Sequence, residues 1–256
     1  LSPPGVGTIR RREGNVSQQV HEVIEQIEER AHDMTVSPRV AASRGRGFLL
    51  VALLALGAFL SLLIAVRRNP RMERDVVVTL RMQRIRHPAL GRMLHIISWP
   101  GFRPQSLILP GVATSSVWLM GFRRDARYMA VAWLASMLSF TTKLLIQRPR
   151  PGGDGILVTA AKLRDSSFPS GHVLHYVCFW GFFAYLCFTK IRGRLSRWVP
   201  TTGIASFISL VGPSRIYLGH HWLTDVLASY SLGTAFLASM IGLHRRHDTG
   251  ANSKKR

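Results

Sequence analysis

The stretch FLLVALLALGAFLSLLIAV, residues Phe48–Val66, decides the fold class, because it is apolar throughout and carries no charge. Its length is close to the roughly 20 residues that a helix needs to cross a bilayer. In lipid such a segment must be helical, since a helix satisfies all of its own backbone hydrogen bonds. The chain is therefore expected to be an all-α membrane protein.

Five further apolar stretches follow, so the sequence predicts a six-transmembrane-helix bundle. Val199–Pro213 is the weakest of the five, because it is short and contains Gly203 and Gly212. The complete set after the first span is Gln105–Phe122, Tyr128–Gln147, Val173–Thr189, Val199–Pro213 and Leu223–His244.

The segments outside the predicted bundle are polar or basic. The arginine-rich connector 67–104 contains Val76–Leu80 and Leu90–Trp99, which are expected to lie along the membrane interface as helices. In the polar segment 1–46, the apolar residues of Val16–Met34 have helical spacing, which fits either an amphipathic helix or a solvated tail. The predicted organisation is a polar tail at 1–46, a membrane domain at 47–247 and a basic tail at 248–256.

The formal net charge is +21, from 34 Lys and Arg residues against 13 Asp and Glu residues. A surplus of this size needs an anionic partner, such as nucleic acid, acidic lipid headgroups or a phosphorylated substrate. Nucleic acid is disfavoured, because the basic residues flank apolar stretches and do not gather in one solvated domain. The expected partners are the lipid bilayer and a phosphorylated lipid, and the oligomeric state is left open.

Three clusters of ionisable residues lie at the ends of predicted helices, where they are costly unless they have a function. Two predicted helices separate the connection that holds the first two clusters from the connection that holds the third. All three clusters therefore fall on the same side of the membrane and can form one site. Together they supply the cations, histidines and carboxylate needed to hold a phosphoryl group and attack it without a metal. The clusters are Lys143…Arg150-Pro151, Pro169-Ser170-Gly171-His172 and Ser214-Arg215…His221…Asp225.

Each cluster also has an ordinary interpretation. A lysine at a helix end commonly extends to the interface, and Ser170 is a reasonable helix cap. His221 and Asp225 are four residues apart, so the carboxylate can accept a hydrogen bond from one imidazole nitrogen and leave the other free to attack. A His–Asp helix pair alone is more often structural. Gly171 opens a predicted helix, where free N–H groups favour an anion, and His172 is placed to protonate a leaving oxygen.

The combination is far more specific than its parts. Lys-x6-Arg-Pro, Pro-Ser-Gly-His and Ser-Arg-x5-His-x3-Asp, in this order, resemble the type 2 phosphatidic acid phosphatase (PAP2) superfamily. All three patterns are complete, and their spacing selects Arg150 over Arg148 and His221 over His220. The resemblance extends over roughly residues 70–245.

The resemblance implies a metal-independent phosphatase without a cofactor that works through a phosphohistidine. His221 would be the nucleophile, Asp225 its orienting partner and His172 the general acid for the leaving group. The phosphoryl oxygens would be bound by Lys143, Arg150, Ser170, the Gly171 backbone and Arg215. The expected substrate is a membrane lipid phosphate or pyrophosphate, such as phosphatidate, phosphatidylglycerophosphate, diacylglycerol pyrophosphate or polyprenyl pyrophosphate.

Two alternative functions remain at the level of sequence. One is a lipid-linked phosphoryl transferase of the same superfamily, in which an alcohol replaces water. The other is a non-enzymatic anion-binding membrane protein, which would be expected to lack the nucleophile or the acid. Basic residues are almost evenly divided between the two sides of the membrane, so charge does not fix the orientation. The resemblance favours a site on the non-cytoplasmic face of the cell membrane, with both termini inside.

Overall fold

The computed structural model describes residues 38–153, 155–159 and 165–253. Within these ranges the regular structure is entirely helical, which confirms the all-α prediction. The chain divides into two units, residues 1–46 and 47–256, and the described part of the first unit is the start of a helix. The predicted amphipathic segment Val16–Met34 lies outside the described residues.

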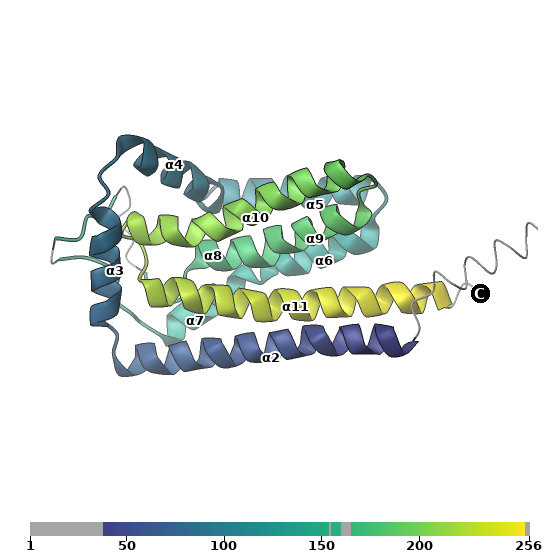
Figure 1. The fold of residues 1–256 in the computed structure, drawn as a ribbon, viewed down its shortest axis with the longest axis horizontal. Helices are drawn as coiled ribbons and strands as arrows, with labels where there is room; N and C mark the ends of the chain where they lie inside the picture. Colours follow the sequence, from purple (N-terminus) through teal and green to yellow (C-terminus); the bar gives the residue numbers. More distant parts are fainter. Residues whose placement is uncertain (1–37, 154, 160–164, 254–256) are drawn as a thin grey trace, which may run out of the picture. The chain divides into compact units, whose positions relative to one another are not determined.

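The helices of the second unit form a bundle in which the long elements run side by side and α3 crosses one end (Figure 1). In chain order the elements are α2 (Pro38–Arg68), α3 (Glu73–Gln83), α4 (Pro88–Ser98), the 3-10 turn η1 (Trp99–Gly101), α5 (Gln105–Leu119), α6 (Arg123–Leu134), α7 (Ser136–Leu145), α8 (Gly171–His175), the π-helical turn η2 (Tyr176–Trp180), α9 (Gly181–Lys190), α10 (Arg194–Tyr217) and α11 (Leu223–Ser253).

Four helical segments of the described chain are long and apolar enough to cross a membrane, so the predicted count of six is not confirmed. Two predicted spans are absent from this set. The helix α5 has only 15 residues and contains Pro110. The helix α10 has 24 residues, but it begins with Arg194 and Arg197 and carries several hydroxyl side chains. The four segments are Arg46–Arg68, Arg123–Leu145, Gly171–Lys190 and Leu223–His247.

The predicted third span, Tyr128–Gln147, is not one continuous helix. It is interrupted at Ala135, between α6 and α7, and helical structure ends at Leu145. Ile146 is extended, with φ −121° and ψ 94°. A helix that continued to Pro149 would lose a backbone hydrogen bond, and the proline ring would clash with the carbonyl of Leu145, four residues before it. This extended segment carries the first cluster into the site.

The continuous segment α8–η2–α9 forms the centre of the bundle. It is the most buried of the four candidate spans, with 61% of its apolar window buried against 17% for Arg46–Arg68 in α2. Its buried side chains include Val173, Tyr176 and Phe179, which pack in the main hydrophobic clusters. The outer helix α2 runs beside α11 (Figure 1), and its apolar surface suits contact with lipid. The central segment therefore holds His172 in a rigid position.

The connector helices α3 and α4 confirm the predicted helical segments between the first two spans. They do not lie apart from the bundle, because α4 packs on α10 and α3 contacts both α10 and α11. The Gln83 amide on α3 donates to the backbone carbonyls of Leu157 and Tyr217 at 2.7 and 2.9 Å. The connector is thus part of the end of the bundle where the clusters meet.

Candidate active site

The three sequence clusters meet at one end of the bundle, held together by hydrogen bonds to backbone carbonyls. Arg150 Nη1 donates to His220 O at 2.7 Å, which joins the first cluster to the third. His221 Nδ1 hydrogen-bonds Ser167 O at 2.7 Å, which joins the third cluster to the segment before the second. The indole N–H of Trp222 donates to Pro149 O at 2.9 Å. Each of these bonds joins a side chain of one segment to the main chain of another, so the fold itself fixes the positions of the three clusters.

His221 is oriented by Ser167, a residue whose role was not predicted. A carbonyl oxygen only accepts, so His221 Nδ1 carries the proton and Nε2 keeps its lone pair. Asp225 Oδ2 lies 3.7 Å from Nδ1, which is longer than a hydrogen bond. The predicted direct bond between Asp225 and His221 is therefore not formed, although the carboxylate lies directly behind the ring.

Asp225 is instead bonded to Arg148, the arginine that the motif spacing rejected. Arg148 Nη1 donates to Asp225 Oδ1, and its Nη2 donates to Asp75 Oδ2 at 2.6 Å. Asp75 on α3 also accepts from the Thr224 hydroxyl at 2.7 Å. The side chains of the three charged residues are at most 1% exposed. One guanidinium thus faces two buried carboxylates, and one of these, Asp225, lies close to His221.

The two predicted phosphate-binding cations of the first cluster share one carboxylate. Lys143 Nζ lies 2.5 Å from Asp165 Oδ2, and Arg150 Nη2 lies 2.6 Å from Asp165 Oδ1. Partial burial raises the pKa of Asp165, but the hydrogen bonds and charges of Lys143 and Arg150 outweigh it and lower that pKa to about 2. Sequence reasoning missed Asp165. The available signal was a lone acidic residue just before the second motif.

The imidazole of His221 is held neutral by its surroundings. Burial lowers its pKa well below the ordinary value, and the charges of Arg150, Arg215 and Lys143 lower it further. All three predicted cations therefore act on the same ring. His220 is fixed differently, since its Nε2 lies 2.6 Å from the carbonyl of Thr159.

Several buried polar atoms of the clusters have no hydrogen-bond partner among the residues that the structure describes. They include Ser170 Oγ, His172 Nε2 and Arg215 Nε. Ser170 was a predicted helix cap, but its hydroxyl makes no capping bond, and its backbone N–H donates to Ser229 Oγ at 2.7 Å. Buried polar groups without partners are unfavourable, so a concentration of them indicates a site for a polar ligand.

The turn between α4 and α5 covers His172 and Arg215. The Phe102 ring meets the His172 ring edge-on, with centroids 4.7 Å apart, and the Arg215 guanidinium lies 5.1 Å from the Phe102 centroid. A Cβ atom on Gly101 would overlap the His172 ring. Glycine is therefore required at position 101 for the turn to approach this closely.

Two cavities border the pair formed by Lys143 and Asp165. One has a volume of about 630 Å³ and is lined by Arg150 as well as by the exposed Leu144. The other has a volume of about 240 Å³ and reaches Gly171. Both include Phe140, which is 59% exposed on the surface of α7. Exposed apolar side chains of α7 therefore lie beside the two cations.

The sequence is similar to known phosphatases over most of its length. The pattern of the PAP2 superfamily matches residues 126–248. Phosphatidylglycerophosphatase B of Bacillus subtilis (strain 168) is 30% identical over 181 residues, which cover 68% of this chain and 85% of that protein. The chain belongs to the PAP2 superfamily.

A solved PAP2 structure agrees with this assignment. The transmembrane PAP2 type phosphatidylglycerolphosphate phosphatase from Bacillus subtilis has a TM-score of 0.67 and 26% identity, over 76% of this chain and 96% of that one. Aquifex aeolicus LpxE has a TM-score of 0.52 and 19% identity, over 69% and 98% of the two chains, which supports the fold alone. The predicted enzyme class, a PAP2-type lipid phosphatase in a multi-pass membrane protein, is confirmed.

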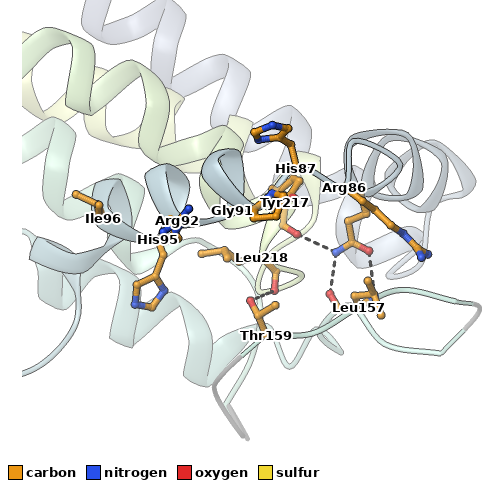
Figure 2. A pocket seen from close by; sticks show the side chains of 12 residues that line it. Arg86, His87, Gly91, Arg92, His95, Ile96, Leu157, Thr159, Tyr217 and Leu218 are labelled. Carbon is orange, nitrogen blue, oxygen red and sulfur yellow. Dashed lines mark hydrogen bonds between the residues drawn. The ribbon is translucent and has the colours of Figure 1, made fainter.

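This PAP2 protein also has a cavity of about 700 Å³ on the side of the connector helices (Figure 2). Arg92 and His95 of α4 lie on one side of it, and Arg86, from the segment between α3 and α4, lies at its other end. At its floor the Thr159 hydroxyl donates to Leu218 O at 3.2 Å, as Figure 2 shows. The predicted catalytic residues His221, His172 and Asp225 are not among the residues that line this cavity.

Proposed function

We propose that the chain hydrolyses a membrane lipid phosphate through a phosphohistidine formed on His221. One observation carries the proposal: a neutral imidazole with a free Nε2 lies under the influence of three cations, beside buried polar atoms that lack partners. A neutral imidazole is a nucleophile, and fixed cations stabilise the charge of a phosphoryl group in transfer. The arrangement suits attack on phosphorus better than simple anion binding, because binding needs no nucleophile.

The proposed reaction has two steps. His221 Nε2 attacks phosphorus while the bond to the leaving oxygen breaks, and protonated His172 gives its proton to that oxygen. Lys143, Arg150 and Arg215 would neutralise the phosphoryl oxygens, with Ser170 and the Gly171 N–H as further donors. Water then attacks the phosphohistidine. The now neutral His172 takes a proton from this water, which releases inorganic phosphate and restores both histidines.

Asp225 would act on this reaction through charge. The imidazole of a phosphohistidine formed at Nε2 carries a positive charge while Nδ1 keeps its proton. Asp225 Oδ2, 3.7 Å from Nδ1, would stabilise that charge, and Ser167 O would hold the ring orientation. The carboxylate is therefore proposed as an electrostatic partner of the nucleophile.

We also propose the finer membrane arrangement that the sequence predicted. The helix α10 is about 36 Å long at 1.5 Å per residue, sufficient for a crossing, and α5 at about 22 Å would cross with local thinning of the bilayer. Six crossings would keep the three clusters on one face, which we propose is the non-cytoplasmic face of the cell membrane. Residues 47–247 would form the membrane domain.

The proposed function is tested by phosphate release from the purified full-length chain in detergent, with a chelator present. The substrates are phosphatidylglycerophosphate, phosphatidate and diacylglycerol pyrophosphate. We expect release without metal, fastest from phosphatidylglycerophosphate, the lipid in the name of the similar Bacillus subtilis enzyme. Absence of release from all three, or release only with added metal, would overturn the proposal. Adding a primary alcohol distinguishes hydrolysis from transfer, because a transferase would form a new phosphate ester.

A second prediction concerns pH. Only unprotonated His221 attacks, so the rate falls as pH drops through its pKa. Because burial and the charges of Arg150, Arg215 and Lys143 lower that pKa, we expect the acid limb of kcat/KM below the ordinary histidine value of about 6.5. Replacing Arg150 with Gln removes one of these charges and should shift the acid limb to higher pH. Titration of the substrate is common to both enzymes, so the difference between their profiles isolates His221. An unshifted limb would contradict this prediction.

A further inference from the structure

The carboxylate of Asp165 occupies the donors that a phosphoryl group would use. Its two oxygens accept from Lys143 Nζ and Arg150 Nη2 at 2.5 and 2.6 Å, as two oxygens of a phosphoryl group would. The other donors of Arg150 are held by main chain, Nε by Asp165 O at 2.9 Å and Nη1 by His220 O at 2.7 Å. The guanidinium is thus fixed in place. A phosphoryl group that takes the same donors of both cations competes with the Asp165 carboxylate.

The Asp165 side chain is free to move away. It is 54% exposed, whereas Lys143 and Arg150 are 16% and 13% exposed. It borders both cavities beside the site, so its carboxylate has space and water on either side. Within the described ranges, these two cations are the only side chains that bond it. Among the described residues, displacement therefore breaks hydrogen bonds to no other side chain.

The other anion-binding groups are not used by Asp165. Arg215 Nε and Ser170 Oγ have no partner among the described residues. A phosphoryl group that replaces the carboxylate would gain these donors in addition to Lys143 and Arg150. The exchange consequently depends on the charge of the incoming group. A monoanionic group would replace the single negative charge of Asp165 with an equal charge. A phosphomonoester near pH 7 carries nearly two negative charges, so its attraction to the two cations exceeds that of the carboxylate.

We propose that Asp165 is a specificity-determining residue, an internal competitor that admits dianionic lipid phosphomonoesters and excludes monoanionic phosphodiester lipids. The inference rests on the proposed function, since it takes Lys143 and Arg150 as the phosphoryl-binding cations. Bilayer lipids are mostly phosphodiesters and are present in great excess over any lipid phosphomonoester. Without a competing carboxylate, their headgroups would occupy the two cations. Asp165 removes this inhibition at the cost of weaker substrate binding.

The test compares wild type with Asp165→Asn in the full-length chain in mixed micelles. The variant keeps the shape of the side chain and removes its charge. We expect the inhibition constant of phosphatidylglycerol, a phosphodiester lipid, to fall about fivefold, with a fall in KM for phosphatidylglycerophosphate. The stabilisation of the folded protein by inorganic phosphate, measured by thermal unfolding, should also increase. This last measurement is independent of turnover.

The matched control is Glu73→Gln, which removes an exposed carboxylate in the first turn of α3. Glu73→Gln should change neither the inhibition constant of phosphatidylglycerol nor KM. Equal effects in both variants would mean that only the net surface charge matters, which would overturn the inference. An unchanged or weaker inhibition by phosphatidylglycerol in Asp165→Asn would also overturn it, and a raised KM would mean that Asp165 only holds the cations in place. If Asp165→Asn does not fold, Asp165→Ser replaces it. A wild type without phosphate release refutes the proposed function instead.

Discussion

Replacing His221 with alanine should reduce phosphate release from a lipid phosphomonoester by at least about a thousandfold. The neighbouring cations would still bind the phosphoryl group, but no nitrogen would be left to attack it. The measurement is the initial rate of phosphate release in detergent with a chelator. A second measurement uses substrate labelled in the terminal phosphate. Wild type quenched in alkali, in which phosphohistidine is stable, should retain label on the protein, and His221→Ala should not.

The matched control for this experiment is His220→Gln. His220 is adjacent in sequence and equally buried, but its Nε2 lies against the carbonyl of Thr159. A glutamine amide can donate to the same carbonyl, so we expect activity within about tenfold of wild type. Retained label or a rate above about one per cent of wild type in His221→Ala would contradict the proposed nucleophile.

Replacing Arg148 with leucine should have the largest effect on stability. The change leaves Asp75 and Asp225 buried without their cation, and breaking a buried pair in this way costs about 3–5 kcal/mol. For a chain of this size the corresponding fall in Tm is about 10 °C. Activity should fall as well, because the unpaired carboxylates would move away from His221. Thermal unfolding in detergent measures the first effect and phosphate release the second.

The matched control is Arg150→Leu, two residues along the same segment. Arg150 bonds a half-exposed carboxylate and also donates to the main chain of His220 and Asp165, so its loss should lower Tm by about 5 °C, roughly half the effect of losing Arg148. It should also raise KM by about ten- to a hundredfold. If Arg150→Leu proves the less stable of the two variants, the assignment of Arg148 to structure and of Arg150 to substrate is wrong.

The different positions of Arg148 and Arg150 in the structure could not be predicted from the sequence. Motif spacing selected Arg150, but it did not reveal what Arg148 does. In a regular strand, side chains two residues apart point to the same face, so Arg148 and Arg150 would be expected to lie together. This segment contains Pro149 and is irregular. Hence Arg148 turns into the core and Arg150 reaches the cavity, which no local pattern predicts.

The helices were easier to predict than the contacts between them. Apolar length alone located Phe48–Val66 within α2 and Leu223–His244 within α11, because hydropathy is a local property. It did not settle the number of crossings, since α5 is short and α10 is partly polar, and neither is among the four described segments that are long and apolar enough to cross. The residues that bond the predicted site residues or their neighbours were not predicted, because such contacts are not a local property. They are Asp75, Ser167 and Asp165. Each owes its role to residues that are distant in sequence and that only folding brings near.

The pairing of Arg148 with two carboxylates also has a consequence for how the protein is made. Asp75, Arg148 and Asp225 leave the ribosome in that order, and Asp225 belongs to the first turn of the last helix. Until α11 exists, Arg148 has Asp75 alone and the buried pair is electrically neutral. The carboxylate of Asp225 is added only with α11, and His221, the proposed nucleophile, lies just before that helix. A chain whose synthesis stops before residue 221 therefore lacks both side chains, and we expect it to release no phosphate.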